Sequence, residues 1–82
     1  MAHTEAEVLA GLADIVAEET GLPIDAVRPG MSFTDDLDVD SLSMMTIITH
    51  AEDVFGVRIP DEDMTKLVTV GDAVNWIMGA QG

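Results

Sequence analysis

The sequence predicts an all-α fold, a small four-helix bundle of three long helices and one short helix, with a long loop between the first two. Apolar residues recur at helical spacing in separate segments of the chain. Only 4% of the residues are aromatic, so aliphatic side chains and six methionines must form the core. At 82 residues the chain fits one small domain over residues 1–82, which leaves no room for a deep catalytic cleft.

The first helix is predicted between Thr4 and Gly21. Thr4 and Glu7 have the spacing of a capping box, and Gly21 is a typical stop. The apolar residues at helical spacing are Val8, Leu9, Leu12, Ile15 and Val16. Glycines and prolines interrupt residues 21–40, which predicts a long loop held to the core at intervals, with a short helical turn at 23–27.

The second helix is predicted over residues 41–55, and Gly56 ends it. Its apolar stripe consists of Met44, Ile47, Ile48, Ala51, Val54 and Phe55. Residues 57–59 are expected to be extended. Pro60 and the three acidic residues after it are typical of a helix start, and they predict a short helix that runs through Leu67.

The last helix is predicted to open at Thr69 and to close at Gly79. Thr69 and Asp72 have the spacing of a second capping box. The apolar residues that follow at helical spacing are Val70, Ala73, Val74 and Ile77.

Acidic residues dominate the charge of the chain. Sixteen Asp and Glu residues oppose three basic residues, Arg28, Arg58 and Lys66, which gives a net charge of −13. Without a basic cluster the chain is not expected to bind nucleic acid or an anionic membrane, and its partners are expected to carry basic patches. The absence of cysteine excludes disulfides and thiolate metal sites. No secretory signal is recognisable, so a soluble, cytoplasmic protein is expected.

Four aspartates lie close together before the second helix: Asp35, Asp36, Asp38 and Asp40. Their alternation is similar to the first ligand positions of an EF-hand loop, but Ser41 and Ile47 stand where that loop requires glycine and glutamate. We therefore predict no metal site. An acidic calcium-binding or purely structural helical bundle stays open as an alternative of a different class, in which Asp38 or Asp40 simply caps the helix.

Ser41 stands at the predicted start of the second helix, where unpaired backbone amides and the helix dipole favour an anion such as a phosphate ester. A catalytic serine needs a neighbouring base. His50 lies along the same helix about 13 Å of axial rise away, so no catalytic residue is predicted. Ser41 is interpreted as an acceptor modified by another enzyme or as an ordinary helix cap.

The face of the second helix opposite its apolar stripe carries Leu42, Met45, Thr46, Thr49 and Asp53. An apolar patch rimmed by carboxylates fits a docking surface for basic partners. Alternatively, the preceding loop folds over Leu42 and Met45.

Three segments of the chain resemble the acyl carrier protein family. The residues similar to its attachment site are Phe33, Asp36, Leu37, Asp40, Ser41 and Leu42. Residues 55–57 followed by 59–63, and residues 69–73 at the start of the last helix, resemble its second half in order and spacing. The resemblance covers about residues 5–78, and residues 32–44 look like the fatty-acid carriers of actinobacteria.

The resemblance implies that a phosphopantetheinyl transferase attaches a 4′-phosphopantetheine arm to Ser41, and that the thiol of this arm carries acyl groups as thioesters. The implied partner-binding residues are Asp36, Asp38, Asp40, Leu42, Met45, Glu52 and Asp53. Because the family shelters acyl chains inside the bundle, the implied lining residues are Ile48, Ala51, Ile59, Met64, Leu67 and Ala73. In a purely structural bundle the same six would be ordinary core.

The resemblance further implies a non-catalytic, monomeric carrier of a dissociated (type II) fatty acid synthase. Its partners would be the transferase, a malonyl transferase, and condensing and reducing enzymes. A discrete carrier of a polyketide or other specialised acyl pathway is the alternative. Bacterial members commonly have glycine where this chain has Asp38, and often acidic residues where it has Ser43 and Thr46, so the second helix is less acidic than usual.

Overall fold

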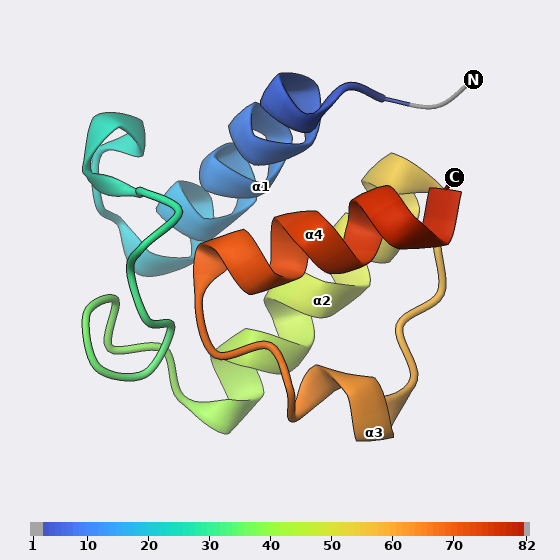
Figure 1. The fold of residues 1–82 in the computed structure, drawn as a ribbon. Helices are drawn as coiled ribbons and strands as arrows, with labels where there is room; N and C mark the ends of the chain where they lie inside the picture. Colours follow the sequence, from blue (N-terminus) through green and yellow to red (C-terminus); the bar gives the residue numbers. More distant parts are fainter. Residues whose placement is uncertain (1–2, 82) are drawn as a thin grey trace.

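The structure, a computed structural model, describes residues 3–81, and within them it consists of four α-helices and one 3₁₀ turn (Figure 1). In chain order these are α1 (Glu5–Thr20), η1 (Ile24–Ala26), α2 (Ser41–Phe55), α3 (Asp61–Met64) and α4 (Val70–Gln81). The predicted all-α class, with three long helices and one short one, is confirmed. α1 packs against both α2 and α4, and the loop at the left of Figure 1 leads from the end of α1 to the start of α2.

Local sequence signals explain where the helices begin and end. In the capping box of α1, the Glu7 carboxylate accepts the Thr4 N–H at 2.8 Å and the Thr4 hydroxyl accepts the Glu7 N–H at 3.2 Å. The Thr4 N–H holds the pKa of Glu7 below its ordinary value. Gly21 and Gly56 end α1 and α2 in the left-handed conformation, at φ +79° and +66°.

The core lies between α1, α2, α4 and the long loop. Each long helix contributes fully buried side chains, for example Val8 and Leu12 from α1, Ile47 from α2 and Ile77 from α4. The loop contributes Val27, Phe33, Leu37 and Val39, all buried, which confirms that apolar side chains hold it to the core at intervals. The predicted turn near residue 23 is the 3₁₀ turn η1.

Backbone contacts hold the loop against the start of α4. The Phe33 N–H donates to Val68 O at 3.0 Å, and the Gly71 N–H donates to Pro29 O at 2.8 Å. A Cβ on residue 71 would lie 3.0 Å from the same Pro29 oxygen, so glycine allows this close approach. The loop before α2 and the segment before α4 are therefore joined side by side.

Three details of the predicted helices are wrong. Val54 does not belong to the buried stripe of α2, because it lies about 80° from the centre of that stripe and its side chain is 54% exposed. The short helix ends at Met64 rather than running through Leu67. Gly79 does not close α4, which continues to Gln81.

Among the described residues, no helix combines the length and apolar character needed to cross a lipid bilayer.

Candidate functional site: the start of α2

Ser41 is the first residue of α2 and follows the N-cap residue Asp40. Its side chain is exposed, and within residues 3–81 its hydroxyl makes no hydrogen bond. The N-terminal amides and the dipole of this 15-residue helix favour an anion here. The hydroxyl is thus free to react, and a phosphate ester formed on it would lie in favourable surroundings.

Asp40 fixes the beginning of α2. Its carboxylate accepts the Ser43 N–H at 2.8 Å, which confirms it as the cap of the helix. The same N–H holds the pKa of Asp40 below its ordinary value, so this carboxylate is firmly ionised at neutral pH. Ser41 is therefore held in the first helical position beside a negative charge.

An open pocket of about 290 Å³ adjoins Ser41. Its walls come from the loop before α2, the first turn of α2, and the segment from α3 to α4. The lining residues are Phe33, Thr34, Val39, Asp40, Ser41, Met44, Met64, Thr65, Leu67 and Val68. A mainly apolar hollow thus opens directly beside the Ser41 hydroxyl.

Two of the six lining residues expected from the sequence, Met64 and Leu67, lie in the wall of this pocket. The other four are buried in the core and are not among its lining residues: Ile48, Ala51, Ile59 and Ala73. Contact of all six with an acyl chain stays a prediction. The sequence reasoning missed Met44, although its spacing of three residues from Ser41 places both on one side of a helix.

The clustered aspartates differ in the contacts that they make within the chain. Asp36 accepts the backbone N–H of Ser32 at 2.8 Å, while Asp40 caps α2. Asp38 is exposed and has a φ of +54°, in the left-handed region. In the part of the chain that the structure describes, no three His, Asp or Glu side chains gather closely enough to hold a metal ion.

The outer face of α2 is open to solvent. Leu42 is 75% exposed and Met45 53% exposed, so the preceding loop does not cover them. Asp53 is exposed on the same face. Glu52 differs, because it is half-buried and its carboxylate accepts the Ile59 N–H at 2.7 Å. Binding of partners at these residues stays a prediction, but Glu52 has an internal contact as well.

Neither His50, which belongs to α2, nor His3, which precedes α1, lies beside Ser41. His50 is exposed more than two turns further along the helix. The His3 ring packs edge-on against Phe55, at the other end of α2, with 5.3 Å between the ring centroids. No imidazole in the described part of the chain is therefore placed to activate the Ser41 hydroxyl.

Comparison with known proteins agrees with this geometry. The family model described as "Phosphopantetheine attachment site" matches residues 10–77. The chain is 68% identical to the acyl carrier protein of Beutenbergia cavernae, with 99% of each chain covered. It is 66% identical to that of Kineococcus radiotolerans, covering 96% of this chain and 98% of the relative.

A solved structure of the acyl carrier protein from Enterococcus faecalis aligns with a TM-score of 0.80 at 38% identity. The alignment covers 95% of this chain and 99% of that structure. Similarity of sequence and of fold thus extends over nearly the whole chain, and the matched residues 10–77 include the start of α2. The chain belongs to the acyl carrier protein family, whose hallmark is a phosphopantetheine attachment site.

Proposed function

We propose that Ser41 carries a 4′-phosphopantetheine arm, and that the chain transports acyl groups as thioesters on the thiol of that arm. The observation that carries this proposal is the exposed, unbonded Ser41 hydroxyl at the start of α2, within the matched region and at the rim of an apolar pocket. The arm supplies a thiol to a chain that has no cysteine. Acyl carrier proteins are carriers rather than catalysts, in keeping with a serine that has no base beside it.

The surroundings of Ser41 fit such an arm. The α2 amides and helix dipole favour its phosphate. The open pocket offers an apolar wall, with Met44, Met64 and Leu67, for the part of the arm or acyl chain that bends back towards the protein. Sheltering of longer chains deeper in the core would require Ile48, Ala51, Ile59 and Ala73 to move apart, because these four are tightly buried.

The pathway that we propose is a dissociated fatty acid synthase, with the chain acting in the cytoplasm as a monomeric, single-domain carrier. Relatives named acyl carrier proteins, which the chain matches over nearly their full length, support the proposal of a single-domain carrier. A polyketide or other specialised acyl pathway would use the same site. The partners would be a phosphopantetheinyl transferase, a malonyl transferase, and condensing and reducing enzymes.

These partners would dock on the outer face of α2 through basic patches. Leu42 and Met45 supply exposed apolar area, and the carboxylates around them supply complementary charge. Asp36 and Asp40 keep negative charge at the surface although each also accepts a backbone N–H. Such contacts weaken with salt, which suits a carrier that must leave each partner quickly.

The experiment is the intact mass of the chain after incubation with coenzyme A and a phosphopantetheinyl transferase. We expect a gain of one phosphopantetheine in the unmodified chain and no gain in Ser41→Ala. Ser43→Ala is the matched control, because it removes a hydroxyl from the same helical turn and should load normally. Loading of a folded Ser41→Ala variant would contradict the proposal.

A further inference from the structure

The short helix α3 depends on contacts with the rest of the molecule for its position. It has only four residues, and its N-cap residue, Pro60, gives no side-chain cap. A helix of this length is not stable alone in water. Its side chain Met64 nevertheless forms part of the pocket wall beside Ser41. Whatever positions α3 therefore also positions this wall.

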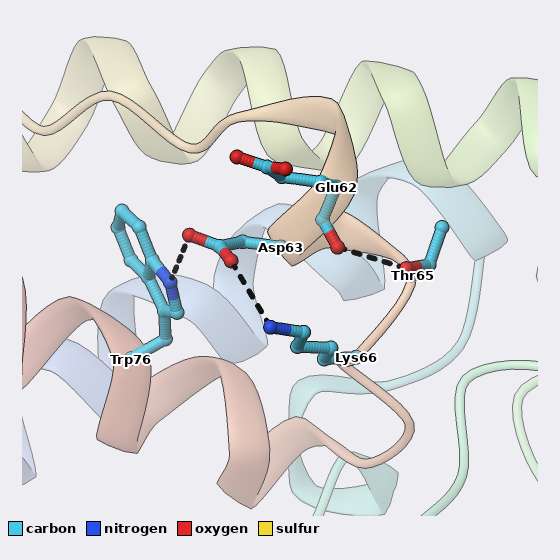
Figure 2. Close-up of polar contacts among 5 residues, drawn as sticks. All are labelled: Glu62, Asp63, Thr65, Lys66 and Trp76. Carbon is cyan, nitrogen blue, oxygen red and sulfur yellow. Dashed lines mark hydrogen bonds and ion pairs between the residues drawn. The ribbon is translucent and has the colours of Figure 1, made fainter.

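The carboxylate of Asp63 joins α3 to α4. One oxygen accepts the indole N–H of Trp76 at 3.3 Å, and the other lies 3.7 Å from the Lys66 ammonium (Figure 2). Lys66 is 76% exposed, so water and salt weaken that ion pair. Trp76 is half-buried and packs against the core, which shields its hydrogen bond better. Of the two contacts, the bond to Trp76 is the one that ties α3 to a rigid element.

The segment around α3 is also held at both ends by backbone groups. At its start, the Ile59 N–H donates to the Glu52 carboxylate of α2 at 2.7 Å. At its end, Val68 O accepts the Phe33 N–H at 3.0 Å. At the same end, the Val68 N–H donates to the Asp72 carboxylate of α4 at 3.2 Å. Between the two anchors, the side-chain bond from Asp63 to Trp76 joins α3 itself to α4. It acts one residue away from Met64.

We propose that Asp63 and Trp76 are positioning residues, whose hydrogen bond holds α3 against α4 and thereby fixes Met64 in the wall of the pocket beside Ser41. The width of the space open to an attached acyl group then depends on this pair. The consequence for acyl groups rests on the proposed function, whereas the position of α3 does not. The main test therefore needs only the chain without its phosphopantetheine arm.

The test compares Asp63→Ala and Trp76→Phe with two matched controls in the full chain without its arm. Glu62→Ala removes a neighbouring carboxylate of α3, and Lys66→Met removes only the ion pair. Two nuclear magnetic resonance readouts report on α3: the ε-methyl signal of Met64 and the exchange rates of the Met64 and Leu67 amides, both of which bond within the segment. The methyl of Met31, elsewhere against the core, reports on the general fold.

We expect both test variants to shift the Met64 methyl and to speed these amides by roughly three- to tenfold, as loss of one hydrogen bond of ordinary net strength implies. The Met31 methyl and both controls should stay unchanged. The double variant should match either single variant, since both remove the same bond. An unmoved Met64 methyl in Trp76→Phe, or an equal effect of Glu62→Ala, would overturn the proposal.

The link to the acyl group is tested in the octanoyl-loaded chain. Cleavage of its thioester by hydroxylamine should be faster in Asp63→Ala and Trp76→Phe than in Glu62→Ala. Equal rates in all three would overturn the link to the pocket. Failure of the unmodified chain to load at all would instead overturn the proposed function, while the measurements on the unloaded chain would still decide the role of Asp63 and Trp76.

Discussion

Asp40 connects the stability of α2 to pH. The Ser43 N–H that it accepts lowers its pKa below the ordinary value of 3.8 in the folded chain. A carboxyl whose pKa is lower when folded stabilises the fold above its unfolded pKa and loses that contribution as the pH falls through the folded pKa. The stabilisation by Asp40 is therefore complete at neutral pH and disappears only in acid, below 3.8.

We predict that Asp40→Ala lowers the thermal unfolding midpoint at about pH 7 and that this difference shrinks at about pH 3. The unfolding midpoint of Asp40→Asn should stay close to that of the unsubstituted chain at neutral pH, because an amide oxygen can also cap a helix. Circular dichroism melts of the three chains at both pH values provide the measurement. A gap between the alanine variant and the unmodified chain that is equally large at both would contradict the assigned role of the carboxylate.

The backbone conformation of Asp38 could be predicted from the sequence only in part. The resemblance to acyl carrier proteins implies that bacterial members commonly have glycine at this position, and a φ of +54° at Asp38 fits that preference. Glycine adopts this region without strain, and aspartate tolerates it better than most other residues. The dihedral angle could not be predicted from an acidic loop, because the sequence does not show that Leu37 and Val39, on either side of Asp38, are both buried in the fold.

At the scale of helices, one glycine sets how closely α1 and α2 approach. A Cβ added at Gly11 would lie 2.8 Å from Cζ of Phe55, closer than atoms normally pack. Phe55 has little freedom to withdraw, because it is buried and also contacts the His3 ring. Gly79 in α4 differs, since nothing lies within 4 Å of an added Cβ there.

We predict opposite effects of the same substitution at these two positions. Gly11→Ala should lower the free energy of unfolding by about 1–2 kcal/mol, because overpacking outweighs the gain in helix propensity. Gly79→Ala should raise it by up to about 1 kcal/mol, since only the propensity changes. Urea denaturation measures both. A stabilised Gly11→Ala variant would show that α1 and α2 are less closely packed than described.

The exposed face of α2 gives a second prediction at this scale. Asp53→Lys should slow loading by the transferase more than Asp14→Lys on α1, although both replace an exposed helical carboxylate and change the net charge equally. The difference between the loading rates of the two variants should become smaller as salt is added. Initial rates of loading measure it, and equal rates for the two variants would contradict a docking surface on α2.

Helix positions could be predicted well because caps and periodicity are local signals. The start of α1 at Thr4 and the ends at Gly21 and Gly56 follow from side chains and glycines next to them in sequence. The prediction that Gly79 closes α4 was wrong, because a glycine caps a helix in this way only where it adopts the left-handed conformation, and Gly79 does not adopt it. Val54 has helical spacing from Ala51, but it lies at the edge of the apolar stripe, about 80° from its centre, and its side chain is 54% exposed there.

At the scale of the molecule, the net charge of −13 is carried by a body of only 30 × 27 × 20 Å. At low ionic strength the repulsion between carboxylates reaches across these dimensions, whereas at about 0.15 M salt the screening length falls to about 8 Å. Self-repulsion of this kind opposes the compact state.

We therefore predict that added sodium chloride, or millimolar magnesium, raises the thermal unfolding midpoint. Melting curves recorded from low to physiological ionic strength measure the effect. A midpoint that does not change with salt would mean that the carboxylates are too widely spread for their repulsion to matter.

The candidate site could be predicted only in part from the sequence, because only some of its residues are adjacent in the chain. Ser41 and the Asp40 cap could be recognised from residues adjacent in sequence. The pocket beside Ser41 could not, because its walls combine the loop near Phe33, the first turn of α2 and the segment after α3. Likewise, the contact between Asp63 and Trp76 joins residues that the fold brings together across two helices.

The central claim, that Ser41 carries the arm, is tested most directly by mapping the modification within the loaded chain. The sequence contains three serines, Ser32, Ser41 and Ser43, so fragment masses from tandem mass spectrometry can separate them. We predict that fragments ending before residue 41 have their unmodified mass and that those including Ser41 but not Ser43 carry the whole phosphopantetheine. An arm found on Ser32 or Ser43, or absence of any arm on a folded chain, would contradict the claim.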